Sequence, residues 1–392
     1  MQGGLKLKQA ADMIYLDHNA TTPIKPEVIA EMKRVMEIGG NPSSAHTVGR
    51  GAKAILESSR QIISNEINCR SQKIIFTGGG TESNNIALKA AGYQHIILSE
   101  TEHDSILGIQ ENFTGTIDCL AVDNNGYISP DVLRKALENA PRNSSGNSSG
   151  TGPEKCLVSL MLANNETGVV QDIKTLADIT HEFGACFHTD AIQAFGKIPV
   201  DFRALGVDMM SLSGHKINGP QGVGALVALE KINIQSLSFG GGQEVGRRAG
   251  TENLAAIAGF AKAVEFIPEN LKNMSAVEKM RNRIEQEIQT HAPCVFFYGA
   301  SSHRLPNTST ILMPGVSSET QVMAFDLGGI CISAGSACSS GKVKPSHVVS
   351  AMGGSQAEAL STIRVSLGIN TTEKEVDAFI AAWIKLYERK RK

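Results

Sequence analysis

The sequence predicts an α/β protein in which a largely parallel sheet lies between helices, followed by a smaller α+β domain. Between positions 73 and 229, short apolar runs alternate with segments of helical spacing, a pattern typical of βαβ units. After position 251 the pattern changes to long helices and short strands. The length of 392 residues favours more than one domain.

The first part of the chain is assigned from its apolar spacing. The segment 52–67 is typical of its helices, because four isoleucines form one apolar stripe along it. By the same criterion we predict helices at 26–38, 52–67, 82–91, 103–112, 130–139 and 173–183. The short apolar runs between them predict strands at 14–16, 73–77, 95–99, 117–122, 156–163, 185–189, 207–210 and 225–229. The polar, Gly/Ser-rich stretch 139–153 predicts a flexible surface loop.

The later part reads as the smaller domain. A long helix begins at about 251 and a second covers 277–291; strands follow at 295–298 and 308–313, and a helix at 319–327. Thr372 and Glu375 have the spacing of a capping box at the start of the last helix. Its expected buried stripe is Val376, Phe379, Ile380, Trp383 and Tyr387. The basic tail 388–392 is a solvated helix end or a docking patch.

Composition excludes several classes of protein. A net charge of -2 argues against a nucleic-acid or membrane-surface partner, and no run of about 18 apolar residues predicts a membrane span. The first 13 residues lack the apolar region of a secretory signal, so we expect a cytoplasmic protein. The seven cysteines are scattered and form no C-x-x-C pair, which predicts neither a disulfide framework nor a metal site.

A candidate phosphate site follows the strand 73–77. Gly78, Gly79 and Gly80 let the backbone approach an anion, and Thr81 can cap the next helix, whose N-terminus favours negative charge. The pattern matches neither the dinucleotide fingerprint nor the P-loop, so we expect the phosphate of another cofactor. Taken alone, a glycine turn before a capped helix is also an ordinary structural feature.

Asp190 and Lys216 complete a second constellation. Asp190 ends a buried strand, where ligands of open α/β sheets bind, although an Asp here can simply cap a helix. Lys216 follows the next strand; it is either a surface cation or a desolvated amine able to form a Schiff base. An anion anchor, an acid to pair with a pyridinium nitrogen and a nucleophilic Lys are together what a pyridoxal phosphate site requires.

Cys338 stands apart from the other cysteines. It lies in Ser333-Ala334-Gly335-Ser336-Ala337-Cys338-Ser339-Ser340-Gly341, a run of small residues that predicts an exposed and mobile loop. A Cys in such a loop near a cofactor is a candidate nucleophile, whereas a structural Cys is normally buried in an apolar strand.

At this point the chain resembles a known family, the pyridoxal-phosphate-dependent cysteine desulfurases of the NifS/IscS type within the class V aminotransferase superfamily. The similarity runs from Tyr15 to about Leu386. It rests on Tyr15-Leu16-Asp17, Gly40-Asn41-Pro42-Ser43-Ser44, Gly80-Thr81-Glu82-Ser83-Asn84, Thr101-Glu102-His103, Asn164-Asn165-Glu166-Thr167-Gly168, Asp190-Ala191-Ile192-Gln193, Ser213-Gly214-His215-Lys216, Arg248-Ala249-Gly250-Thr251, Gly335-Ser336-Ala337-Cys338 and Arg364-Val365-Ser366-Leu367-Gly368. His18-Asn19 replaces a commoner pair, and 139–153 is longer than usual.

The resemblance implies a role for each of these residues. Lys216 would carry the cofactor, Asp190 would pair with its ring nitrogen, Gln193 would reach its phenolic oxygen, and His103 would stack on the ring. The cofactor-binding set would be Gly80, Thr81, Asn165, Asp190, Gln193, Ser213, His215, Lys216 and Thr251, with Thr251 coming from the other subunit of a homodimer. Asn165, Arg364 and Asn41 would bind the substrate. Cys338 would take the sulfur as a persulfide; no metal is expected, although Cys338 could transiently ligate a cluster on a scaffold.

The resemblance also implies the architecture and the reaction. We expect fold type I, with a mainly parallel seven-stranded sheet in a large domain at 21–260, and a small domain at 1–20 and 261–392 that carries the Cys loop at about 330–345. The expected reaction converts L-cysteine to L-alanine and supplies sulfur to iron–sulfur scaffold or other acceptor proteins. The alternatives are a selenocysteine lyase, another class V aminotransferase, or a non-catalytic sulfur-relay or scaffold-binding protein.

Overall fold

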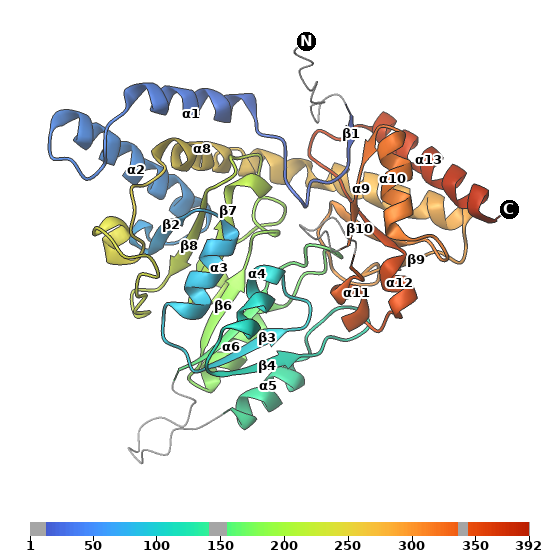
Figure 1. Cartoon of the computed structure of the whole chain (residues 1–392), viewed down its shortest axis with the longest axis horizontal. Coiled ribbons are helices and arrows are strands. Elements are labelled where there is room, and N and C mark those ends of the chain that lie inside the picture. Colours follow the sequence, from blue (N-terminus) through green and yellow to red (C-terminus); the bar gives the residue numbers. More distant parts are fainter. Residues whose placement is uncertain (1–12, 141–154, 336–343, 392) are drawn as a thin grey trace, which may run out of the picture.

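A computed structural model describes residues 13–140, 155–335 and 344–391. Its centre is a seven-stranded sheet, with β8 antiparallel to both neighbours and all other adjacent strands parallel (Figure 1). The predicted mainly parallel seven-stranded sheet is therefore confirmed. In spatial order the strands are β2 (Ile74–Thr77), β8 (Gly224–Ala228), β7 (Met209–Ser213), β6 (Cys186–Asp190), β5 (Cys156–Met161), β3 (His95–Ser99) and β4 (Thr116–Leu120).

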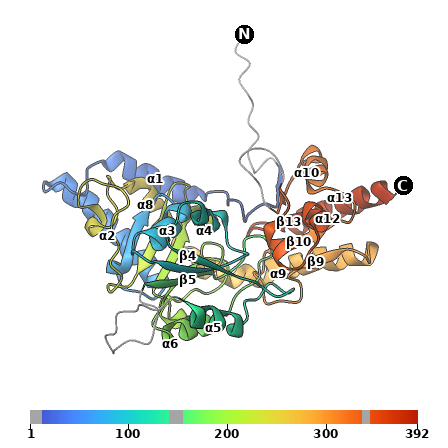
Figure 2. The same ribbon diagram turned by 60° about the horizontal axis from the view of Figure 1, so that its bottom comes forward.

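Helices cover both faces of this sheet, because alternate residues of its buried strands point to opposite sides. On β2, Ile75 belongs to the apolar cluster under α3 (Gly80–Lys89) and α4 (Asp104–Leu107), whereas Ile74 and Phe76 belong to the cluster on the other face. The second face is covered by α2 (Thr47–Glu66), α5 (Pro130–Asn139), α6 (Ile173–Glu182) and α8 (Leu254–Val264). Figure 2 shows α3 and α4 above strands β4 and β5, with α5 and α6 below them.

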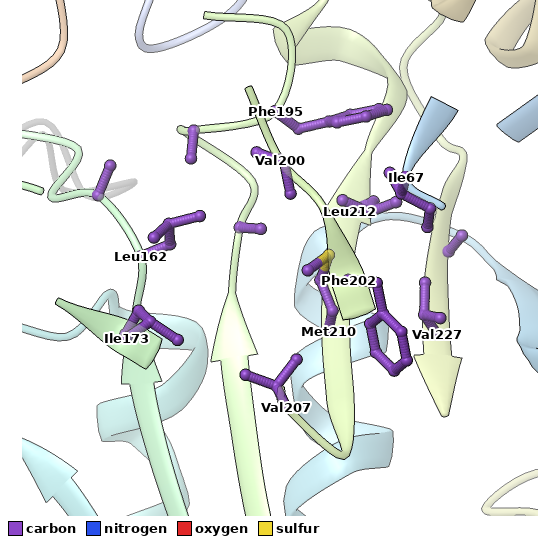
Figure 3. Close-up of a cluster of buried hydrophobic side chains, with 14 of the residues drawn as sticks. Ile67, Leu162, Ile173, Phe195, Val200, Phe202, Val207, Met210, Leu212 and Val227 are labelled. Atoms are coloured by element: carbon purple, nitrogen blue, oxygen red, sulfur yellow. The ribbon is translucent and has the colours of Figure 1, made fainter. Parts of the chain in front are cut away.

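The larger cluster continues beyond the strands into the segment that joins β6 to β7. Three apolar residues of this segment, Phe195, Val200 and Phe202, lie outside the sheet. They pack against Met210 and Leu212 of β7 (Figure 3). Helix α7 (Phe202–Leu205) lies in this segment, and α1 (Pro26–Ile38) packs on α8. This packing fixes the segment from Asp190 to Lys216, which carries much of the site.

The C-terminal part has its own apolar core. A four-stranded antiparallel sheet, ordered β12 (Ser333–Ala334), β13 (Thr362–Ser366), β10 (Thr308–Leu312) and β9 (Phe296–Tyr298), packs with α9 (Ile267–His291), α10 (Ser318–Leu327) and α13 (Glu373–Arg391). Strand β1 (Ile14–Tyr15) pairs with β11 (Ile330–Cys331), which brings the N-terminal segment to this core. Two short helices, α11 (His347–Ala351) and α12 (Gln356–Leu360), complete it.

The last helix agrees with its prediction in detail. Thr372 and Glu375 exchange hydrogen bonds as a capping box, and the whole predicted stripe of α13 is buried. No helix in the part of the chain that the structure describes is long and apolar enough to cross a membrane. The predicted loop 139–153 falls outside the described residues beyond Ala140.

Several predicted boundaries were wrong, each for a local reason. Helix α2 begins at Thr47 because the His46 side chain accepts a hydrogen bond from Gly49 N and caps it earlier. Helix α3 begins at Gly80 with Gly79 as its N-cap, so Thr81 is not the cap. Strand β7 continues to Ser213, and α9 begins ten positions before the expected 277 with a proline in its first turn.

Candidate active site

A cavity of about 400 Å³ lies at the carboxyl ends of the parallel strands, where the C-terminal core meets the large sheet. Ligand sites of open α/β sheets form at this edge. Residues far apart in the sequence line it, from the glycine turn after β2 to Arg364 on β13. Of the predicted site residues, the cavity brings together Gly80, Thr81, His103, Asn165, Asp190, Gln193, Ser213, His215, Lys216 and Arg364.

Lys216 reaches the cavity from the short 3₁₀ turn Gly214–Lys216 that follows β7. Its Nζ donates to the backbone oxygens of Asn19 and Ala20, at 2.5 and 2.7 Å. Burial, together with the nearby Arg364 cation, lowers the pKa of Lys216 to about 7. A Lys with such a pKa is a neutral nucleophile in a large fraction of molecules near neutral pH, so the surface-cation alternative does not hold here.

Asp190 is the last residue of β6 and is buried. Its Oδ1 accepts from Ile192 N at 2.9 Å, and its Oδ2 accepts from Asn84 Nδ2 at 2.8 Å. Burial raises the pKa of this carboxyl, and these hydrogen bonds oppose the rise. A cationic ring nitrogen bound beside Asp190 would favour the ionised form, which is the pairing that a pyridine ring requires.

The turn from β2 into α3 forms one side of the expected phosphate cradle. Gly79 has φ +148°, and a Cβ on Gly224 of β8 would come within 3 Å of Gly79 backbone atoms, so both positions need glycine. Opposite the turn, Ser213 Oγ is buried and has no hydrogen-bond partner within the described chain. An unpartnered hydroxyl facing a helix N-terminus fits a phosphate group.

Two histidines from different elements line the same cavity: His215 in the turn after β7, and His103 just before α4. Burial, with the nearby Lys216 and Lys197, lowers the pKa of His215 to about 4, so its ring is neutral near pH 7. Its Nδ1 lies 3.2 Å from Thr21 Oγ1. The His103 Nδ1 accepts from Ser105 N at 3.0 Å and caps α4, which fixes the ring at the cavity wall.

Arg364 supplies a cation at the far end of the cavity. It lies on β13, opposite Ser333 of β12, and is buried. Its Nη2 donates to Asp17 Oδ1 at 2.8 Å and its Nη1 donates to the backbone oxygen of Asn165 at 3.1 Å, while Nε is buried without a partner in the described structure. A guanidinium held in this way is suited to a carboxylate.

Three predicted residues are placed differently. Asn41 is exposed in the loop before α2, does not line the cavity, and accepts from Ser43 N at 2.8 Å. Thr251 is exposed and lines a separate cavity of about 180 Å³ with Gly78 and Arg248. Cys338 lies outside the described residues, although Gly335 before it lines the main cavity.

The cavity is also lined by residues that the sequence analysis did not assign to the site. Asn19, Glu166 and His347 all line it. His347 Nε2 lies 2.9 Å from the backbone oxygen of Glu102, and Glu166 Oε2 accepts from Ser346 Oγ. Glu166 lay inside a quoted motif, but no local pattern marks His347, because its position depends on the fold bringing α11 to α4.

Comparison with known proteins identifies the family to which the chain belongs. The profile of the family described as Aminotransferase class-V matches residues 14–379. The chain belongs to this family. It is 39% identical over 389 residues to a protein of Dictyoglomus turgidum named cysteine desulfurase IscS, with 96% of this chain and 95% of that protein covered. The chain therefore belongs to the cysteine desulfurase branch, and it is a pyridoxal-phosphate-dependent enzyme of the NifS/IscS type.

Solved structures agree with the architecture of this branch. The enzyme matches a NifS-like protein from Rickettsia africae with a TM-score of 0.87 and 37% identity, covering 96% of this chain and 99% of that one. It also matches a structure described as SspA in complex with cysteine, with a TM-score of 0.76, 31% identity and coverage of 90% and 98%. Fold type I, expected from the motifs, is thereby confirmed.

Proposed function

We propose that the cavity removes sulfur from L-cysteine and releases L-alanine, with the sulfur left as a persulfide on Cys338. In this reaction the carbon–sulfur bond of the substrate breaks and a sulfur–sulfur bond forms at Cys338. The β-carbon gains a proton and is reduced, while the transferred sulfur is oxidised. L-cysteine plus a protein thiol thus gives L-alanine plus a protein persulfide, and no other oxidant is needed.

The cofactor would be held by residues from both sides of the cavity. Lys216 would hold it covalently, Asp190 would pair with the ring nitrogen, and Gln193 would donate to the phenolic oxygen, with His103 over the ring. The phosphate would lie among Gly80, Thr81, Ser213 and His215, with Thr251 of a second copy beside it, and Asn165 near the ring. Bound pyridoxal phosphate supplies an electron sink for bonds at the substrate α-carbon.

The substrate carboxylate would bind at Arg364. The buried guanidinium, its unpartnered Nε and the adjacent Asn165 support this assignment. We propose Asn41 as a further substrate contact, made when the loop before α2 adjoins the site of a neighbouring copy. An anchored carboxylate would fix the direction of the substrate side chain, which we propose to lie toward Gly335, a residue that lines the same cavity and precedes Cys338 in the sequence.

Proton transfers would be carried by Lys216 and His103. A Lys with a pKa of about 7 can both take up and release a proton at the pH of the reaction. The His103 Nδ1 is used in capping α4, so its other nitrogen is the one available to the bound molecules. The two groups would therefore serve different steps, with Lys216 at the α-carbon and His103 at the substrate sulfur.

The observation that carries the proposal is the meeting of Lys216, Asp190 and Arg364 in one cavity that Gly335 also lines. The decisive variant is Cys338→Ala. It should keep the visible absorbance of the bound cofactor and yield no alanine from cysteine. Normal alanine formation by this variant would overturn the role of Cys338, and comparing turnover on cysteine and selenocysteine would separate a desulfurase from a selenocysteine lyase.

We also propose a homodimer, a domain division and partners. Phe239 and Val245 are almost fully exposed near the Thr251 segment, as expected of a surface covered by a second copy.

The two apolar cores support domains at 21–260 and at 1–20 with 261–392. The partners would be L-cysteine and iron–sulfur scaffold or other sulfur-acceptor proteins. No disulfide joins the six described cysteines, which supports a reducing, cytoplasmic location.

A further inference from the structure

Lys197 is a buried lysine directly behind the cofactor-facing wall of the cavity. It lies in the segment after β6, one helical turn beyond Gln193, and is only 5% exposed. Its Nζ donates to Gln193 Oε1 at 2.5 Å and to Asn19 Oδ1 at 3.0 Å. No carboxylate pairs with it among the described residues. A buried Lys without a counter-charge is costly, so its retention requires a reason.

The hydrogen bonds of Lys197 fit a neutral amine. Burial, followed by the nearby Lys216 and Arg364 cations, holds its pKa well below the usual range. Burial lowers the pKa of His18, on the N-terminal segment near Lys197, to about 4, so this neighbour is also neutral near pH 7. A neutral amine has two N–H groups, and Lys197 has two acceptors, the side-chain oxygens of Gln193 and Asn19.

This arrangement fixes which end of the Gln193 amide faces the cavity. Because an amine N–H donates to Oε1, that oxygen must point toward Lys197, and Nε2 must point the other way. Nε2 donates to the backbone oxygen of Asn19 at 2.9 Å. The same oxygen accepts from Lys216 Nζ. The Gln193 NH₂ group is therefore held beside the amine that carries the cofactor.

Asn19 ties this arrangement to the C-terminal core. Its side-chain oxygen accepts from Lys197 and also from Asn307 Nδ2 at 3.1 Å. Its Nδ2 donates to Thr308 Oγ1 at 2.9 Å and to the backbone oxygen of Asn165 at 3.1 Å. Every polar atom of the Asn19 side chain is thus engaged, so Asn19 is a fixed reference against which Lys197 can orient Gln193.

We propose that Lys197 is a positioning residue that orients the Gln193 amide so that its NH₂ group, and not its oxygen, meets the phenolic oxygen of the cofactor. This inference rests on the proposed contact of Gln193 with that oxygen. Lys197 itself touches neither substrate nor cofactor. Its removal would leave the amide free to turn, which would weaken or reverse the hydrogen bond to the phenolic oxygen.

The test is the pH at which the visible absorbance of the bound cofactor changes, measured on the holoenzyme without substrate. A donor to the phenolic oxygen makes the oxygen less basic, so losing it should move the midpoint upward. For Lys197→Met we expect a shift of about one to two pH units, as for one hydrogen bond to an anion. Lys135→Met, an exposed lysine on α5, is the matched control and should not shift the midpoint.

A double-mutant cycle then shows whether Lys197 acts through Gln193. In the Gln193→Ala background, Lys197→Met should add no further shift. An unchanged midpoint in Lys197→Met, or an equal shift with and without Gln193, would overturn the proposal. If Lys197→Met does not fold, the Gln193→Glu variant is measured instead, because a glutamate carboxylate has no N–H to donate to the phenolic oxygen. An unshifted midpoint in Gln193→Glu would also refute the inference. Because no substrate is present, failure here is separate from failure of the Cys338 assignment.

Discussion

The carboxylate of Asp17 holds the guanidinium of Arg364, because Asp17 Oδ1 accepts a hydrogen bond from Arg364 Nη2 at 2.8 Å. The two residues are separated by almost the whole length of the chain. Asp17 Oδ2 also accepts from Ser333 Oγ at 3.0 Å. Both carboxylate oxygens are thereby used, and Arg364 is fixed with Nε unpartnered. Asp17, just after β1, thus orients the group proposed to bind the substrate carboxylate.

We expect Asp17→Asn to raise the KM for L-cysteine by about tenfold, corresponding to about 1.4 kcal/mol of binding free energy, because a charge-assisted hydrogen bond that aims Arg364 becomes a weaker one. The kcat should change less, since the reacting groups are elsewhere. Steady-state alanine formation measures both constants. Asp326→Asn, an exposed change on α10, is the control. Equal KM values in the two variants would show that Asp17 does not position Arg364.

The alternation of strands and helices could be predicted because it is a local property. Six strands of the large sheet are buried on almost their whole length and therefore appear as mainly apolar runs, whereas the edge strand β4 is partly exposed. The antiparallel direction of β8 could not be predicted, because direction depends on how the chain returns to the sheet. Strand β13 was also not recognised as an element, since Thr362, Arg364 and Ser366 interrupt its apolar residues with buried polar ones.

The candidate site was predictable where one residue type in one position carries the chemistry. Asp190 ends one buried strand and Lys216 comes just after another, so both could be found from the sequence, and the resemblance added His103 and Arg364. Asn19 and Lys197 could not be found in this way. Their importance comes from hydrogen bonds between segments far apart in the chain, which no local spacing encodes.

The pKa of Lys216 leads to a second prediction, concerning the recombination of apoenzyme with pyridoxal phosphate. The nucleophile is the neutral amine, so the rate should rise with pH up to about 7 and then level off, because the folded-state pKa is about 7. An ordinary lysine would instead continue to accelerate toward pH 10. The return of visible absorbance after mixing gives the rate.

The control for this pH profile is a free lysine derivative with a blocked α-amine, which should react with the cofactor ever faster up to about pH 10. If the apoenzyme followed the same profile as the free amine, the buried environment of Lys216 would not lower its pKa in solution. A plateau near neutrality in the protein alone would establish that burial and Arg364 activate this amine.

A third prediction concerns Gly224, which lies under the glycine turn of the phosphate cradle. A Cβ here would lie 2.6 Å from the Leu212 oxygen and 2.7 Å from the Gly79 carbonyl carbon, and these are backbone atoms that cannot rotate away. Gly224→Ala should destabilise the protein by about 1–3 kcal/mol and weaken cofactor binding, because the cradle must shift.

The matched control is Gly51→Ala on the exposed side of α2, where a Cβ would meet nothing within 4 Å. It should be neutral or slightly stabilising, since alanine favours a helix over glycine. Cofactor affinity is measured by titrating apoenzyme with pyridoxal phosphate, and stability by denaturant unfolding. A Gly224→Ala variant with unchanged affinity would show that the cradle tolerates movement of Gly79.

The fourth prediction concerns the buried ion pair between Arg60 and Glu244. Glu244 accepts from Nη1 and Nη2 of Arg60, at 2.8 and 2.9 Å, and from Phe76 N at 2.9 Å. These bonds hold the segment leading toward Thr251 against β2. Glu244 has φ +48°, so its conformation depends on these bonds. Replacing it leaves a buried Arg60 charge without its partner.

We therefore expect Glu244→Gln to lower the free energy of unfolding by about 3 kcal/mol, in the range for breaking one side of a buried pair. The control makes the same chemical change in an exposed pair, Glu31→Gln beside Arg34, and should cost less than about 1 kcal/mol. Denaturant unfolding of the two holoenzymes at equal concentration gives the difference. If both variants lost the same small amount, the Arg60–Glu244 pair would not be what holds this segment in place.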